Sequence, residues 1–297
     1  MKTAAEHIDF LKTLVERGGP AENEWASVHE WMFELGKAIE EKKYSEAEII
    51  QIYTEIGNAF PVDTIHGHTY HKPRKYAGDF ELVDKIQTCF VTSDKHFANW
   101  DRYFHSCEAP RAVRYRIPYL IEVLEETIKT KKKEFSFLNI ASGPCRDIFT
   151  FFTRHPNAEI QIDCVEHDKD AVAFSNDLLK DYSGKINFYN TSFLRFHFQK
   201  KYDFIWSAGL FDYFDDNFFV RKLKLIIENL NPGGQIVIGN LAETNPSKYY
   251  MLLFKWIVFH RTKEHLIKLA IEAGAAEKNI SVLKEPLGVN YFLHINS

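Results

Sequence analysis

Apolar residues recur at intervals of three and four positions along the first 130 residues of the chain. This spacing predicts amphipathic helices that each bury one face. The predicted helices are Ala4–Arg17, Asn23–Lys42, Ser45–Asn58, Asp79–Thr88, Asp94–Cys107 and Ala109–Lys129. The pattern therefore indicates an N-terminal helical domain over residues 1–130.

The helical period disappears between Pro61 and Phe80. The stretch DTIHGHTYHKPRKYAGDF concentrates polar, aromatic and glycine residues, a composition that favours a functional loop. His66, His68 and His71 in this stretch suggest a metal site. No nearby Cys, Asp or Glu completes a recognisable ligand set, so we expect no metal there.

From residue 131 onward, short apolar runs alternate with helical patterns, which predicts an α/β domain over residues 131–297 with a mainly parallel sheet covered on both faces. The predicted strands are Phe137–Ala141, Ile160–Val165, Ile186–Asn190, Tyr202–Ser207, Gln235–Asn240, Ile280–Glu285 and Val289–Ile295. The predicted helices between them are Asp147–Arg154, Lys169–Asp181, Phe218–Leu230 and Lys263–Ala273. The last two strands must be antiparallel, because a parallel pair needs a longer crossover than the short connection at 286–288.

The stretch FLNIASGPCRD, residues 137–147, is the centre of this pattern. It predicts a buried strand, a tight turn and the start of a helix, the first βα unit of a nucleotide-binding sheet. The small residues Ala141, Ser142 and Gly143 would let a ligand approach the backbone. Glu166 ends the second strand, where a carboxylate can accept hydrogen bonds from both hydroxyls of a ribose. Since only one glycine is present, an ordinary strand-to-helix turn is the alternative.

Composition restricts the possible partners. The chain has 37 Lys and Arg against 41 Asp and Glu, and its net charge of −4 gives no general reason to expect binding to nucleic acid or to an anionic membrane. The basic run at Lys129–Lys133 is typical of a solvated face. Four cysteines without paired spacing indicate reduced thiols in a cytoplasmic protein. The charged N-terminus does not resemble a signal peptide, and the apolar run at Tyr249–His260 is too short to span a bilayer.

Residues 137–295 resemble the class I S-adenosylmethionine-dependent methyltransferases. NIASGPC stands where that family has its glycine-rich first motif and VEHD (165–168) where it has the ribose acid; YDFIWSAGLFDYFDD (202–216) and LNPGGQIVIGN (230–240) match later motifs. The resemblance implies a Rossmann-like, seven-stranded methyltransferase sheet with its last strand antiparallel, and S-adenosyl-L-methionine as cofactor. The chain departs from the pattern at Asn139 and Ser192, where acids are usual, and at Ala141 and Cys145, where glycines are usual.

A narrower resemblance covers both halves of the chain. HKPRKYAGDF (71–80), AVRYR (112–116), SAGLFDYF and FKWIVFHRT (254–262) look like the bacterial methyltransferases for biosynthesis of the 3-hydroxypalmitic acid methyl ester signal. This implies a small-molecule methyl acceptor, with carboxyl O-methylation of a hydroxy fatty acid or similar small acid. The alternatives are N- or O-methylation of another metabolite, a dehydrogenase, and a non-catalytic cofactor-binding module.

The resemblance also implies site residues. Those expected to bind the cofactor are Tyr76, Ala141, Ser142, Gly143, Pro144, Arg146, Glu166, His167, Asp168, Ser192, Phe193, Ser207, Ala208 and Gly209. The expected catalytic residues are Asp212, Tyr213 and His260, and the expected substrate residues are Arg74, Asp79, Trp256 and Arg261. Other interpretations fit as well: Asp212 as a helix N-cap, Arg261 as a surface ion pair, His260 as a structural histidine, and Arg74, Tyr76 and Asp79 as a buried contact network.

Overall fold

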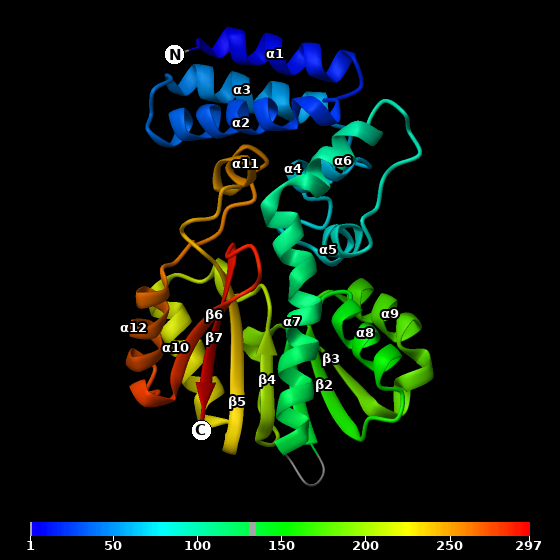
Figure 1. Ribbon diagram of the computed structural model, residues 1–297, viewed down its shortest axis with the longest axis vertical. Coiled ribbons are helices and arrows are strands. Elements are labelled where there is room, and N and C mark those ends of the chain that lie inside the picture. Colours follow the sequence, from blue (N-terminus) through cyan, green and yellow to red (C-terminus); the bar gives the residue numbers. More distant parts are fainter. Residues whose placement is uncertain (1, 131–134) are drawn as a thin grey trace. The chain divides into compact units, whose positions relative to one another are not determined.

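The computed structural model describes residues 2–130 and 135–297, and the chain divides into two compact units (Figure 1). The first unit comprises Met1–Arg111 and Pro246–Ile257, and the second comprises Ala112–Asn245 and Val258–Ser297. The expected domain boundary at residue 130 coincides with the end of helix α7 (Glu108–Thr130), whereas the two units part within that helix. Most of the basic run at Lys129–Lys133 lies outside the described residues. Among the described helices, none is long and apolar enough to cross a membrane.

The first unit is helical, as the spacing of apolar residues predicts. Its helices are α1 (Ala4–Glu16), η1 (Glu22–Glu24), α2 (Trp25–Glu40), α3 (Glu46–Ala59), α4 (Ile65–His71), α5 (Phe80–Gln87), α6 (Ala98–Ser106), the start of α7, and α11 (Lys248–Leu253). Thr3 and Ser45 begin α1 and α3 with capping boxes, in which the side chain and the glutamate three residues later bond each other's backbone N–H. These caps explain why both helices start where the sequence predicts.

Helix α4 corrects the expectation of a loop after Pro61. The Thr64 side chain accepts a hydrogen bond from the N–H of Gly67 and begins the helix. A Cβ at Gly67 would overlap the carbonyl of Pro61, so the turn of chain before the helix packs directly on its backbone. The buried positions of α4 include His66 and His68, which are polar. The helix therefore lacks the apolar stripe by which the sequence would have revealed it.

The second unit contains one sheet of seven strands, in the order β3-β2-β1-β4-β5-β7-β6 (Figure 1). The strands are β1 (Phe135–Ile140), β2 (Ile160–Glu166), β3 (Ile186–Asn190), β4 (Tyr202–Ser207), β5 (Leu230–Leu241), β6 (Ile280–Lys284) and β7 (Asn290–Asn296). Strand β7 is antiparallel to both of its neighbours, and β1 to β5 pair in parallel. The predicted α/β fold with an antiparallel last strand is confirmed. Strand β5 begins earlier than expected, because the NPGG segment continues it with an irregular register beside β4.

Helices cover both faces of this sheet. Helices α7 and α8 (Arg146–Arg154) pack on one face against side chains such as Phe137 and Trp206. Helices α10 (Asp216–Glu228) and α12 (Lys263–Glu272) pack on the other face against side chains such as Leu138 and Ile140. Alternate residues of β1 thus enter opposite layers, as expected of a strand with both faces buried. The remaining short elements of this unit are α9 (Lys169–Leu178), η2 (Lys180–Lys185), η3 (Phe193–Arg195), η4 (Phe211–Tyr213) and η5 (Glu277–Asn279).

The strand order places a topological switch between β1 and β4. The chain proceeds outward from β1 through β2 to β3, and then returns to β4 on the other side of β1. The connections after β1 and β4 therefore diverge at their carboxyl ends, which is where open α/β sheets bind ligands. This edge of the sheet carries the candidate site.

Phe292→Ala is expected to lower the free energy of unfolding of the second unit by about 3 to 5 kcal/mol, because it removes a fully buried ring. Phe292 stacks on Tyr119 of α7, with ring centroids 3.7 Å apart, and on Trp206 of β4. Chemical denaturation measures the change. Leu283→Ala is the matched control, since Leu283 lies directly opposite on β6 but is 51% exposed. Equal losses in the two variants would contradict the packing described.

Candidate functional site

The turn after β1 has an unusual backbone. Ala141, Gly143 and Cys145 adopt the left-handed conformation, with φ of 54°, 55° and 52°. This conformation costs a residue with a side chain roughly 1 to 2 kcal/mol. Ala141 and Cys145 are the positions where the resemblance led us to expect glycine, so the turn keeps a glycine-type backbone with other residues. Strain of this kind concentrates at functional sites, where the surrounding structure maintains it.

Glu166 holds this turn at the end of β2. Its Oε2 accepts a hydrogen bond from the N–H of Gly143 at 2.9 Å, and its Oε1 accepts one from the N–H of Asp168 at 2.9 Å. His167 Nδ1 lies 2.9 Å from the same Oε1, and this hydrogen bond raises the pKa of His167. A carboxylate can accept about four hydrogen bonds, so Oε2 retains room for one more. Glu166 is only 5% exposed, so little of this carboxylate is in contact with solvent.

Polar and open positions remain at the same turn. The Oγ of Ser142 and the Nδ2 of Asn139 are buried and have no hydrogen-bond partner among the described residues. A Cβ added at Gly143 would meet no atom within 4 Å. Buried polar atoms are normally bonded, and an exception calls for an explanation such as a missing ligand. The turn therefore has the free space and the unpaired groups that a polar ligand would use.

Several other residues expected to bind the cofactor have structural contacts of their own. The carboxylate of Asp168 caps α9 by accepting from the N–H of Asp170, and Ser192 caps η3 by accepting from the N–H of Leu194. Phe193 is buried in the α10–α12 layer of the core. These contacts explain the local structure and leave the expected roles of the three side chains as predictions.

The end of β4 is joined to the end of β1. The Oγ of Ser207 donates a hydrogen bond to the carbonyl of Ile140 at 3.2 Å. The next two residues, Ala208 and Gly209, approach other backbone and side-chain atoms closely, and a Cβ at Gly209 would lie 2.5 Å from Nη1 of Arg116. In the turn after β1, Pro144 is buried. Just beyond it, the Arg146 guanidinium lies over the ring of Phe174, 5.5 Å from the ring centroid. The expected residues at the ends of β1, β2 and β4 thus do gather at one edge of the sheet.

Asp212 lies in η4 just beyond β4, and it is 3% exposed. Its Oδ1 accepts from the N–H of Leu241 at 2.6 Å, and its Oδ2 lies 3.6 Å from Nη2 of Arg116. Burial raises the pKa of Asp212 to about 6, against the opposing effect of the Arg116 charge. Asp212 is not a helix cap, since the cap of α10 is Asp215, which accepts from the N–H of Phe218.

Arg116 of α7 is a site residue that the sequence did not reveal. Its Nε and Nη2 donate to Oδ1 of Asn290 at 3.0 and 2.7 Å. Burial lowers its pKa, although Asp212 opposes that effect. The motif AVRYR contains Arg116, but a sequence motif cannot indicate which arginine reaches the carboxyl edge of the sheet.

Arg261 has a structural role that its expected role toward substrate did not anticipate. It is 2% exposed, and each of its five N–H donors has an acceptor within the second unit. The acceptors are Asp216 from Nε and Nη2, the Phe211 carbonyl and Asn240 from Nη1, and the Phe214 carbonyl from Nη2. Arg261 is therefore neither a surface ion pair nor, with these bonds in place, a donor for an acidic substrate.

Two expected catalytic residues have partners in the second unit. His260 Nε2 lies 3.1 Å from Nδ2 of Asn245, a residue that is 4% exposed. Tyr213 is partly buried and packs against the α10–α12 layer of the core. Neither contact tests a catalytic role, so both roles stay predictions.

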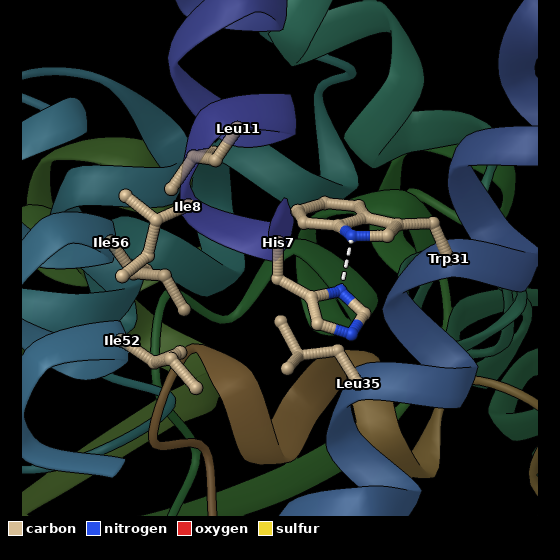
Figure 2. A pocket seen from close by; sticks show the side chains of 7 residues that line it. All are labelled: His7, Ile8, Leu11, Trp31, Leu35, Ile52 and Ile56. Carbon is tan, nitrogen blue, oxygen red and sulfur yellow. Dashed lines mark hydrogen bonds between the residues drawn. The ribbon is translucent and has the colours of Figure 1, made fainter. Parts of the chain in front are cut away.

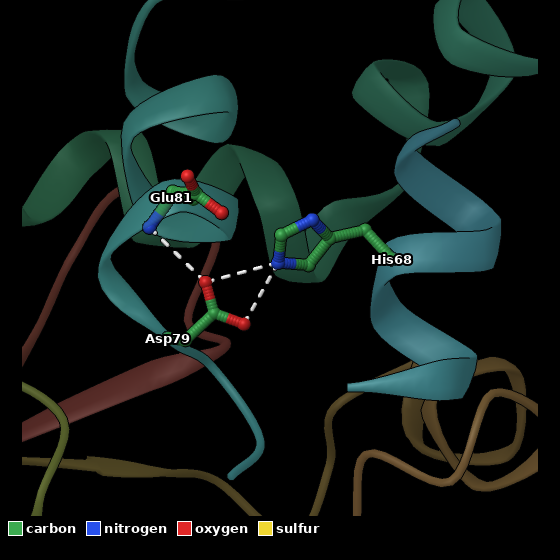
Figure 3. Close-up of side chains that lie close together, drawn as sticks. All are labelled: His68, Asp79 and Glu81. Carbon is green, nitrogen blue, oxygen red and sulfur yellow. Dashed lines mark hydrogen bonds and ion pairs between the residues drawn. The ribbon is translucent and has the colours of Figure 1, made fainter. Parts of the chain in front are cut away.

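The remaining expected residues, Arg74, Tyr76, Asp79 and Trp256, belong to the first unit. Asp79 begins α5 by accepting from the N–H of Glu81 and Leu82, and both of its oxygens lie within 3.0 Å of His68 Nε2 (Figure 3). Arg74 Nη2 donates to Glu81 at 3.1 Å. These contacts give Arg74 and Asp79 structural roles, and the roles of all four toward cofactor or substrate stay predictions.

The histidines after Pro61 require one correction. His66 bonds Tyr250, and His71 bonds the carbonyls of Gly57 and Phe60. His68, however, lies with two acids: potential ligand atoms of His68, Asp79 and Glu81 are within 4.8 Å of one another. The expectation that no acid lies near these histidines was wrong for His68, because the fold brings the start of α5 against α4. The observed contacts there are the hydrogen bonds between His68 and Asp79 and the helix cap that Asp79 provides.

A small pocket lies between α1, α2 and α3 of the first unit (Figure 2). Its lining residues are His7, Ile8, Leu11, Trp31, Leu35, Ile52 and Ile56. Nδ1 of His7 accepts a hydrogen bond from the Trp31 indole at 2.8 Å, and burial lowers the pKa of His7. A neutral histidine with an apolar lining is typical of a packing gap in a helical core.

Comparisons with known proteins place the fold. No protein-family model matches the chain, and no curated protein matches it. Among solved structures, a possible exported protein from Bordetella parapertussis is 15% identical over 100% of this chain and 97% of its own, with a TM-score of 0.66. The S-adenosylmethionine-dependent methyltransferase SibL (9% identical, 88% of this chain, 76% of its own, TM-score 0.52) and the CurJ carbon methyltransferase (13%, 61%, 53%, 0.51) are also similar. At these identities the likeness shows a shared fold.

Ala141→Gly is expected to raise the free energy of unfolding by about 1 kcal/mol, because glycine adopts the left-handed backbone without the cost of a Cβ. Ala141 is exposed, so its methyl group leaves no buried cavity. Gly143→Ala is the matched reverse change and is expected to lower the free energy of unfolding by about 1 kcal/mol. Chemical denaturation measures the free energy of unfolding of both variants. Changes of the same sign in the two variants would contradict the left-handed backbone described for this turn.

Asp212→Asn is expected to change how stability depends on pH. A raised carboxyl pKa means that the folded protein binds the proton more tightly than the unfolded chain, so Asp212 contributes stability below about pH 4 that is lost as the pH rises to about 6. The variant lacks this loss. Its free energy of unfolding, relative to the unchanged protein, should therefore rise by about 1 to 3 kcal/mol between about pH 4 and pH 7.

Denaturation at a series of pH values measures this difference. Asp215→Asn is the control, since Asp215 is an exposed helix cap and asparagine caps equally well. A difference between Asp212→Asn and the unchanged protein that does not vary with pH would contradict the assigned environment.

Proposed function

We propose that this protein is an S-adenosylmethionine-dependent methyltransferase that acts on a small molecule, and that the acceptor is the carboxyl group of a hydroxy fatty acid or a similar small acid. The observation that carries the proposal is the strained turn at 141–145, bonded by Glu166 at the topological switch point of the sheet. The methyltransferases SibL and CurJ have the same fold, which agrees with this proposal.

The residues at the turn fit the proposed cofactor. Oε2 of Glu166 has room to accept from a ribose hydroxyl, and the unpaired Oγ of Ser142 is available to the methionine portion. The open space above Gly143 lets a ligand approach the backbone there. When bound, S-adenosylmethionine supplies a methyl group on a sulfonium, which is transferred by in-line displacement.

The work left to the protein is alignment and exclusion of water. The bonds from Glu166 to the turn and from Ser207 to Ile140 fix the ends of three neighbouring strands. A carboxylate acceptor is already ionised at neutral pH and needs no general base, whereas a hydroxyl acceptor needs one. The acid acceptor therefore makes the smallest demand on the residues present.

Calorimetric titration with S-adenosylmethionine and S-adenosylhomocysteine tests the cofactor. Glu166→Gln is expected to weaken binding of both by about 1 to 3 kcal/mol, because the amide cannot accept from the ribose and from the N–H of Gly143 as the carboxylate does. Glu159→Gln is the control, since Glu159 is exposed just before β2. Binding to the unchanged protein should be saturable.

The outcomes separate the alternatives. Absence of binding to either ligand would falsify the proposal, and binding of NAD instead would favour a dehydrogenase. Cofactor binding without turnover of any acid, hydroxyl or amine acceptor would favour the alternative of a non-catalytic cofactor-binding module. Methyl ester formation from hydroxy fatty acids would support the proposed acceptor.

A further inference from the structure

Arg116 has one guanidinium nitrogen that is not used inside the protein. Its Nε and Nη2 bond Asn290, and Nη2 faces Asp212, but Nη1 makes no hydrogen bond to a residue in the ranges 2–130 and 135–297. The side chain is 13% exposed, so this nitrogen belongs to a largely buried charge. Buried charged groups are normally paired or bonded. The two N–H donors of Nη1 are not among the buried atoms without a partner, so they are open to the outside of the protein and available to a ligand.

The free nitrogen lies at the edge where the proposed cofactor would bind. Nη1 packs against Gly209, two residues beyond the end of β4. Strand β4 pairs with β1 in register up to Trp206, and Ser207 bonds the carbonyl of Ile140. Nη1 therefore lies at the carboxyl end of β4, the strand that pairs with β1.

The acids near Arg116 do not use its free donors. Glu285, which is 1% exposed, accepts from the N–H groups of Leu287, Val289 and Asn290. Asp212 accepts from the N–H of Leu241 and lies 3.6 Å from Nη2, beyond hydrogen-bond distance. Asp212 forms an ion pair with the guanidinium, but the direct hydrogen bonds of Arg116 go to the neutral amide of Asn290, so the two N–H donors of Nη1 are left for an anion.

We propose that Nη1 of Arg116 binds a ligand carboxylate at this edge of the sheet. This proposal rests on the proposed function. The carboxylate then has two sources, the acid that accepts the methyl group and the methionine end of the cofactor. Because Nε and Nη2 already bond Asn290, Nη1 alone would donate to the carboxylate, in a charge-assisted hydrogen bond. Arg261, the arginine first expected to meet an acidic substrate, has no donor left for it.

Paired ligands that differ only in the carboxylate test this assignment. One pair is 3-hydroxydecanoate and its methyl ester, titrated with S-adenosylhomocysteine present; the other is S-adenosylmethionine and its decarboxylated analogue. Arg116→Gln is expected to weaken the carboxylate member of one pair about 10- to 100-fold and its partner little. Loss confined to 3-hydroxydecanoate assigns Arg116 to the acceptor, and loss confined to S-adenosylmethionine assigns it to the cofactor. Unchanged affinity for both carboxylates overturns the proposal.

Two further variants cover the case in which Arg116→Gln fails to fold. Arg116→Lys keeps the charge and is expected to retain part of the preference for the carboxylate. Gly209→Ala keeps Arg116 but pushes Nη1 from its place, and is expected to reduce that preference. Arg221→Gln is the control, because Arg221 is an exposed arginine of α10. A full carboxylate preference in Gly209→Ala overturns the proposal.

The two proposals fail separately. If S-adenosylhomocysteine does not bind the unchanged protein, the proposed function fails. The comparison of 3-hydroxydecanoate with its ester, without cofactor, then still measures whether Arg116 binds a carboxylate.

Discussion

Three buried carboxylates bond the backbone N–H groups at one edge of the sheet, and the rest of the site depends on them. Glu166 bonds the turn after β1, Asp212 bonds the end of β5, and Glu285 bonds the turn between β6 and β7. Loop backbone at this edge has no neighbouring strand to satisfy its donors, and each unpaired buried donor would cost roughly 1 to 3 kcal/mol. The same bonds that stabilise the loops therefore also fix the positions of the residues between them.

The two arginines near Asp212 differ in how many of their N–H donors bond acceptors within the protein. Arg261 is 2% exposed, the side chain of Arg116 is 13% exposed, and both lie near Asp212. All donors of Arg261 bond protein acceptors, so it acts as a brace between η4, β5 and the start of α10. Arg116 is held by a single amide and retains a free nitrogen. Arg261 thus stabilises the scaffold, whereas Arg116 keeps the donors to which we assign a ligand carboxylate.

The sequence predicted the fold well because its signals there are local. Strand alternation, capping residues such as Ser45, and the spacing of Glu166 after Gly143 each depend on nearby residues. Helix α4 was missed because most of its buried side chains are polar. The roles of Arg116 and Arg261 could not be predicted either, since they depend on which acceptors, far apart in sequence, surround each guanidinium. The position of an arginine in a sequence motif does not determine how many of its N–H donors bond acceptors within the protein.

The contacts of Asp212 bear on the nature of the acceptor. A general base must have an oxygen within hydrogen-bond reach of the proton that it removes. Asp212 is 3% exposed, its Oδ1 accepts from the N–H of Leu241, and its Oδ2 faces Arg116. With both oxygens directed at protein groups, Asp212 is better placed to orient Arg116 than to deprotonate a hydroxyl. An acceptor that arrives already ionised needs no base and can meet the free nitrogen of Arg116 directly, so the arrangement favours a carboxylate over an alcohol.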